Sequence, residues 1–160
     1  MADLDFATCN EITRRVYEYA YGIDTRDWEL YRSIFTEDIR VDFESYNGNP
    51  PSVMRADDWV SNVQVLFTGL HATQHSMSNP LVDIDGDNAR CRMYMQAEHF
   101  FITDQGDNDY VLGGYYDDQL ANTDTGWRIE AVTLNVLWHR GNRHIMELAV
   151  ARGAQQLGLD

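Results

Sequence analysis

The sequence predicts an α+β fold in which helices near the start of the chain precede a curved antiparallel sheet. In the first 67 residues, apolar side chains recur mostly at spacings of three and four, which is typical of amphipathic helices. After residue 70, long segments alternate apolar and polar residues, and short turns containing Asp, Gly or Thr separate them. The 160 residues contain no repeat and no linker, so we expect a single domain over 1–160.

The elements of the first part follow from this spacing and its interruptions. An apolar stripe marks the first helix, and the charged run Asp-Thr-Arg-Asp ends it. A strand is expected where apolar and charged residues alternate, and a loop where Asn-Gly-Asn-Pro-Pro occurs. The expected elements are helices over 5–23, 26–35 and 55–67, a strand over 39–45 and a loop over 46–54.

The second part predicts a meander of strands followed by a terminal helix. Strands of this length must twist and curl over the helices, so we expect a pocket between the concave sheet face and the helices. The expected elements are strands near 79–84 and over 88–102, 109–122 and 127–139, and a helix over 143–157.

The charged residues exclude several classes of function. All 12 basic residues are arginine, so Schiff-base chemistry, a pyridoxal-phosphate anchor and a Walker A lysine are excluded. The 26 acidic residues give a formal charge of −14, which argues against nucleic-acid and anionic-membrane partners. No signal peptide or membrane-spanning run is recognisable, so the expected localisation is cytoplasmic. Cys9 and Cys91 are expected to be reduced.

Three polar residues share a face with apolar ones and are candidates for a site. His99 lies in the apolar row of 88–102 and is either a core histidine with one partner or a functional group. Asp24 follows the first helix and either caps the next helix or extends a carboxylate toward the pocket. Tyr19 lies on the apolar stripe and either packs in the core or offers its hydroxyl to a substrate oxygen.

A metal site is not expected. His71 and His75 are four residues apart, but on a strand this places them roughly 13 Å apart along the chain. No HExxH motif or cysteine cluster is present. We therefore expect no metal and no cofactor.

Several segments together resemble the SnoaL-like branch of the NTF2-like superfamily over about residues 8–142. They include Tyr-Ala-Tyr-Gly-Ile-Asp-Thr-Arg-Asp-Trp at 19–28, Ala-Thr-Gln-His at 72–75, Ala-Glu-His at 97–99 and Gly-Trp-Arg-Ile at 126–129. The resemblance implies an α+β cone whose curved sheet wraps three N-terminal helices. One fold hosts many activities, so the segments specify the fold more closely than the reaction.

The resemblance also implies a site like those of scytalone dehydratase, bile-acid dehydratase and hexachlorocyclohexane dehydrochlorinase. By matching position, Asp24 would orient His75 as the general base, and Tyr19 and His99 would bind or protonate the substrate oxygen. Val132 lies where the dehydrochlorinase carries an arginine, which argues against halide elimination. Pocket walls are expected from Phe35, Phe43, Trp59, Met77, Met95 and Val132.

These expectations lead to one main hypothesis and two alternatives. The main one is a cofactor-independent lyase (dehydratase) or isomerase acting on a small hydrophobic, oxygenated ring compound related to polyketides, terpenoids or steroids. The alternatives are a non-catalytic binding module and a subunit resembling the small β subunit of ring-hydroxylating dioxygenases. Apolar residues Tyr94, Phe100 and Ile102 on the convex sheet face favour a homodimer or homotrimer.

Overall fold

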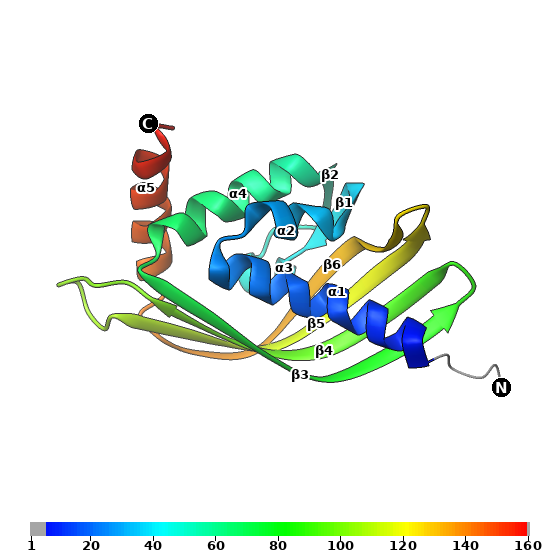
Figure 1. Cartoon of the computed structure of the whole chain (residues 1–160). Coiled ribbons are helices and arrows are strands. Elements are labelled where there is room, and N and C mark those ends of the chain that lie inside the picture. Colours follow the sequence, from blue (N-terminus) through cyan, green and yellow to red (C-terminus); the bar gives the residue numbers. More distant parts are fainter. Residues whose placement is uncertain (1–5, 160) are drawn as a thin grey trace.

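The computed structural model describes residues 6–159, which form helices above one curved sheet (Figure 1). The elements in chain order are α1 (Phe6–Thr25), α2 (Trp28–Ser33), β1 (Phe35–Asp42), α3 (Glu44–Asn47), β2 (Ser52–Arg55), α4 (Ala56–Gly69), β3 (Ala72–Asp85), β4 (Asn88–Phe100), β5 (Asp109–Thr123), β6 (Gly126–Gly141) and α5 (Ile145–Leu157).

The sheet has the strand order β2-β1-β6-β5-β4-β3. All neighbouring strands are antiparallel except β1 and β6, which run parallel. The long strands β3 to β6 curve beneath α1 and α4 (Figure 1). The predicted α+β class and NTF2-like cone are therefore confirmed.

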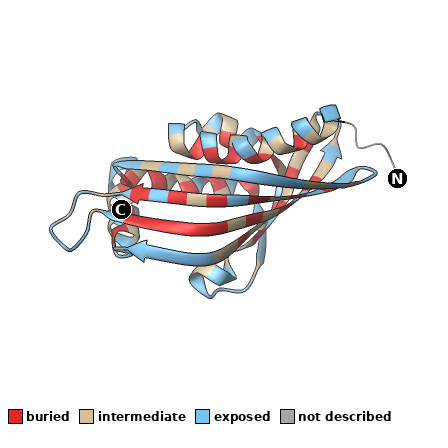
Figure 2. Cartoon of the chain, turned by 90° about the horizontal axis from the view of Figure 1, so that it is seen from below, coloured by how far each residue is buried: buried red, intermediate tan, exposed pale blue. Residues whose placement is uncertain are grey.

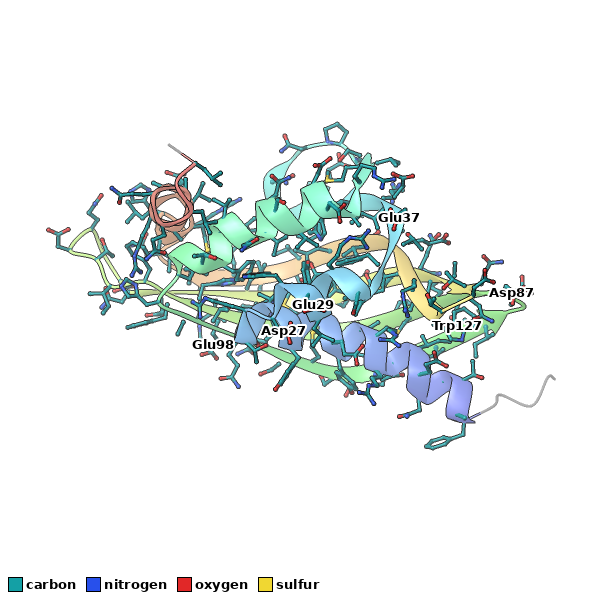
Figure 3. The ribbon with its side chains drawn as sticks, turned by 45° about the horizontal axis from the view of Figure 1, so that its top comes forward. Asp27, Glu29, Glu37, Asp87, Glu98 and Trp127 are labelled. Carbon is teal, nitrogen blue, oxygen red and sulfur yellow. The ribbon has the colours of Figure 1, made fainter. Side chains whose placement is uncertain are left out.

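The inner face of the sheet is apolar and buried, as the period-two pattern predicted (Figure 2). Along β4, every second residue from Ala89 to His99 is buried. Labelled acidic side chains such as Glu29, Glu37 and Glu98 lie on the outer surface, where water solvates their charge (Figure 3). Cys9 and Cys91 are both free thiols.

The first part of the chain differs from the prediction in two places. The predicted loop over 46–54 contains the second half of α3 and all of β2 except its last residue, and both elements are too short for a recognisable period. The predicted helix over 26–35 ends at Ser33, because Phe35 is buried and begins the parallel pairing with β6. The strand predicted over 39–45 accordingly begins at Phe35 and ends at Asp42.

Helices α4 and α5 are in direct backbone contact. A Cβ atom added to Gly69 would lie 1.7 Å from the carbonyl oxygen of Ala149, and one added to Gly153 would lie 1.8 Å from that of Val65. Only glycine permits such an approach. Arg152 donates a hydrogen bond of 3.1 Å to the Gly69 carbonyl and so completes the end of α4.

The helices give no indication of a membrane span. Within residues 6–159, no helix has both the length and the apolar character needed to cross a bilayer.

Candidate active site

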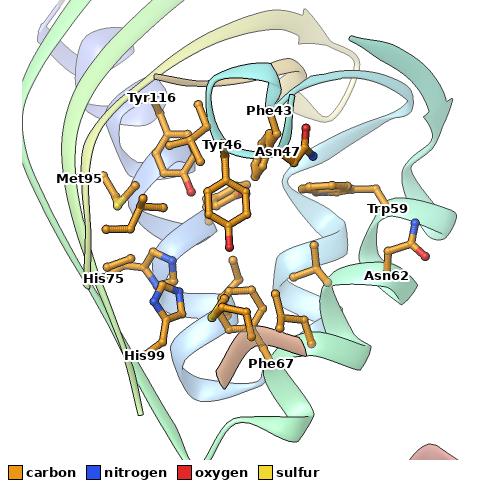
Figure 4. Close-up of a pocket in the computed structure, with 18 residues that line it drawn as sticks. Phe43, Tyr46, Asn47, Trp59, Asn62, Phe67, His75, Met95, His99 and Tyr116 are labelled. Carbon is orange, nitrogen blue, oxygen red and sulfur yellow. The ribbon is translucent and has the colours of Figure 1, made fainter. Parts of the chain in front are cut away.

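A cavity of about 190 Å³ lies between the concave sheet face and the helices (Figure 4). The sheet contributes side chains from β3, β4, β5 and β6, and the opposite wall comes from α1, α3, α4 and α5. The lining residues are Tyr19, Ile23, Phe43, Tyr46, Asn47, Trp59, Asn62, Val63, Leu66, Phe67, His75, Met95, Ala97, His99, Leu112, Tyr116, Leu134 and Met146.

The last turn of α1 and the strand β3 bring Asp24 and His75 together. The Nδ1 atom of His75 lies 2.7 Å from Oδ1 of Asp24, and the backbone N–H of His75 donates to Oδ2, also at 2.7 Å. This pair of contacts fixes both the strand and the imidazole ring. Because the carboxylate accepts the Nδ1 proton, the neutral ring keeps Nε2 as a proton acceptor.

The pair lies between the cavity and a shallow hollow on the outer surface. His75 lines both spaces, whereas Asp24 lines only the outer hollow, together with Tyr17, Tyr21 and Met77. The His75 side chain is 3% exposed and that of Asp24 is 20% exposed. The carboxylate therefore contacts the imidazole on the side away from the cavity and does not itself line the cavity.

His99 lies on the neighbouring strand β4, with its ring centroid 6.2 Å from that of His75. Its Nδ1 donates to the Tyr110 carbonyl oxygen at 3.1 Å, which leaves Nε2 as an acceptor. Burial, followed by the nearby His75, lowers the pKa of His99 to about 4. His99 is therefore neutral near pH 7, and the Phe67 ring packs against both histidines.

The hydroxyl of Tyr19 belongs to a buried chain of tyrosines. The Tyr19 ring packs against those of Tyr31 and Tyr116, with ring centroids 5.1 and 5.0 Å apart, and the three hydroxyl groups interact with one another. The Tyr31 oxygen also accepts a hydrogen bond of 3.0 Å from Nε1 of Trp59. Burial raises the pKa of all three phenols well above the usual value, so they stay protonated near neutral pH.

Asp118 is a buried carboxyl group that the sequence interpretation missed. Asp118 on β5 is only 1% exposed, whereas the side chain of Asp24 is 20% exposed. Burial raises the pKa of Asp118 well above its usual value, and neither of its carboxyl oxygens has a hydrogen-bond partner among the described residues. Period-two spacing from Tyr116 to Leu120 could have placed it on the inner face.

The structure brings most of the expected site residues to the cavity, but not all. Tyr19, His75 and His99 line it, as do the expected wall residues Phe43, Trp59 and Met95. Three residues expected as walls lie elsewhere: Phe35 packs against Tyr19 and Tyr31, Met77 lies at the outer hollow, and Val132 is fully buried in β6.

The sequence interpretation also missed three polar residues of the cavity: Tyr46, Asn47 and Asn62. Tyr46 and Asn47 belong to the short helix α3, and Asn62 lies on α4. No lining residue is an aspartate, a glutamate or an arginine. With His99 neutral, the cavity suits an uncharged ligand that carries a few polar atoms.

Comparisons with known proteins place this architecture among described relatives. The family model of the SnoaL-like domain matches residues 6–133. The protein Rv2910c of Mycobacterium tuberculosis (strain H37Rv), which is uncharacterised, is 31% identical over 121 residues, covering 74% of this chain and 78% of that protein. The dehydratase GME11372 of Pestalotiopsis microspora is 23% identical over 135 residues, covering 79% of this chain and 85% of that enzyme.

A solved structure shows the same fold. The crystal structure of Kfla4162 from Kribbella flavida superposes with a TM-score of 0.82 at 27% identity, covering 89% of this chain and 97% of that chain. The family match ends within β6, so the cavity residues Leu134 and Met146 lie outside it, as does Arg143.

Proposed function

The chain belongs to the SnoaL-like domain family. We propose that it is a cofactor-independent lyase (dehydratase) or an isomerase, and that it uses His75 as its general base. The observation that carries this proposal is the 2.7 Å contact between Asp24 and Nδ1 of His75 beside an apolar cavity. A base within hydrogen-bonding reach of an orienting carboxylate is competent for proton abstraction. The family relative named as a dehydratase supports the same class.

In the proposed dehydration, Nε2 of His75 removes a proton from a carbon next to a substrate carbonyl. The C–H electrons form the new double bond, and the C–O bond of the neighbouring carbon breaks. The imidazolium of His75 then returns this proton to the departing hydroxyl, which leaves as water, so the base is regenerated and no oxidant or reductant is needed. Asp24 stabilises the imidazolium that forms, and such a positioned base contributes about 10²–10⁴-fold to the rate.

The other polar residues would hold the substrate. Neutral His99 presents an acceptor and would bind a substrate hydroxyl, because its low pKa makes it a poor proton donor near pH 7. The Tyr19 hydroxyl interacts with the hydroxyls of Tyr31 and Tyr116, so Tyr19 would act mainly by ordering Tyr116 at the cavity wall.

The cavity also narrows the proposed substrate class. Its volume of about 190 Å³ lies below the roughly 300–1,000 Å³ that is usual for drug-sized ligands. A neutral compound of one or two rings, of polyketide or terpenoid type, therefore fits better than a steroid. An isomerisation would use the same base and return the proton to another carbon.

The test uses 3-hydroxy-1-tetralone, a neutral two-ring hydroxyketone that becomes 1-naphthol when it loses water. We expect the protein to accelerate naphthol formation and His75→Ala to remove about 10²–10⁴-fold of the rate. His71→Ala is the matched control, because His71 lies outside the cavity. Equal rates for the protein and His75→Ala would overturn the assignment of the base.

The binding-module alternative makes a different geometric prediction. A non-catalytic pocket does not require the aspartate to be within about 4 Å of the histidine. The observed double contact between Asp24 and His75 therefore favours catalysis.

A further inference from the structure

Three tyrosines line the cavity, and their hydroxyl groups have different surroundings. The hydroxyls of Tyr116 and Tyr19 interact with each other and with that of Tyr31 inside the buried tyrosine chain. Among the hydrogen bonds found within residues 6–159, none is donated by the hydroxyl of Tyr46. Figure 4 shows this hydroxyl pointing into the cavity. Tyr46 is thus the phenol whose proton is available to a ligand.

Helix α3, which carries Tyr46, is fastened to the sheet on both sides of this residue. The hydroxyl of the preceding Ser45 donates to the Leu134 carbonyl oxygen at 2.5 Å and accepts from the Val136 N–H at 3.0 Å. Nη2 of Arg143 donates to the Tyr46 carbonyl oxygen at 2.8 Å. Both tethers come from β6 or the segment directly after it.

Arg143 also acts on the ring itself. Its guanidinium carbon lies 4.5 Å from the centre of the Tyr46 ring, within cation–π distance. Burial raises the pKa of the Tyr46 phenol, while the charge and a hydrogen bond of Arg143 oppose the rise. The phenol therefore stays protonated near neutral pH, and the adjacent cation favours negative charge close to it.

We propose that Tyr46 donates a hydrogen bond to the substrate's carbonyl oxygen and that Arg143 is its positioning residue. When His75 removes the proton from the neighbouring carbon, negative charge develops on that oxygen. A fixed donor aimed at this position stabilises the transition state. No arginine lines the cavity, and Arg143 contacts the Tyr46 ring from outside the lining.

This inference rests on the proposed function for the identity of the oxygen, but the donor can be tested without turnover. The probe is 1-tetralone labelled with ¹³C at the carbonyl; it lacks the hydroxyl and cannot lose water. Its affinity is measured by Trp fluorescence, since Trp59 lines the cavity, and its carbonyl stretch is measured by infrared difference spectroscopy. A hydrogen bond to the carbonyl lowers the stretching frequency.

We expect Tyr46→Phe to weaken binding about tenfold, the usual effect of one lost hydrogen bond at the upper end of its range. The carbonyl frequency should rise to that of the ketone in an apolar solvent. Tyr21→Phe, in which an exposed tyrosine loses the same hydroxyl, is the matched control and should change neither quantity. Arg143→Met should raise the frequency in part, and Arg143→Lys should restore it.

Three results would overturn the proposal. They are an unchanged frequency in Tyr46→Phe, a frequency change that appears in Tyr116→Phe instead, and no binding of 1-tetralone to the unmodified protein at millimolar concentration. Failure of the dehydration assay with a normal carbonyl signature would count against the proposed function and not against this donor. Circular dichroism of each variant checks that it is folded.

Discussion

Acid should destabilise the protein through His99, and the size of the effect follows from its environment. The side chain is only 4% exposed and packs between the Phe67 and Tyr110 rings, with His75 close by. These surroundings lower the pKa of His99 from 6.5 to about 4. At about 1.4 kcal/mol per unit, the shift corresponds to about 3 kcal/mol of folding free energy.

The sign follows from which state binds the proton first. As pH falls below 6.5, the unfolded chain protonates this histidine while the native state keeps it neutral. The full stability is therefore present above pH 6.5 and is lost progressively as pH falls to about 4. Asp118 has the opposite effect on stability in part of this range, because its raised native pKa means that its protonation stabilises the folded state.

The assay is urea unfolding at several pH values between 4 and 7.5 for the protein and for His99→Gln, which cannot titrate. Asp118 is present in both chains, so its contribution cancels in the difference between them. We expect the stability advantage of the unmodified protein over His99→Gln to shrink by about 3 kcal/mol on acidification. Parallel stability curves, or a His99 proton resonance that titrates near 6.5, would refute the reasoning.

Three further predictions concern other groups. Asp24→Asn should lower kcat in the dehydration assay by about 10²–10⁴-fold and the Tm by roughly 2–4 °C, because one of two contacts to His75 is weakened; a variant with full activity would contradict the orienting role. Asp118→Asn should become more stable relative to the unmodified protein as pH rises from 4 to 8 in the same urea assay, because ionising the buried carboxyl group costs folding free energy. A stability difference between the two proteins that does not change with pH would contradict this effect of Asp118. Tyr94 is 52% exposed on the convex face, so Tyr94→Glu should dissociate the predicted homodimer or homotrimer, as measured by light scattering. An unmodified protein that already scatters as an 18.5 kDa monomer would refute the predicted oligomer.

The sequence predicted well which face of each long helix or strand is turned toward the cavity, because the spacing of apolar residues repeats many times along these elements. The alternation along 88–102 placed His99 inside, and the apolar stripe of the first helix placed Tyr19 inside. The pairing of Asp24 with His75 joins residues 51 positions apart, so no local pattern could show it and only the family resemblance suggested it.

The failures have local physical causes. Tyr46 lies in a four-residue helix beside Pro-Pro and Asn-Gly signals, which are typical of loops. Met77 does share the face of His75, but this part of β3 runs along the outer hollow and not along the cavity. Val132 is fully buried in the sheet, as its apolar character predicts, but it does not line the cavity.

The glycine contact between α4 and α5 limits how a ligand can enter. With Gly69 and Gly153 leaving no side chain between the two backbones, neither helix can slide past the other without collision. The C-terminal helix therefore behaves as part of a rigid wall and not as a lid.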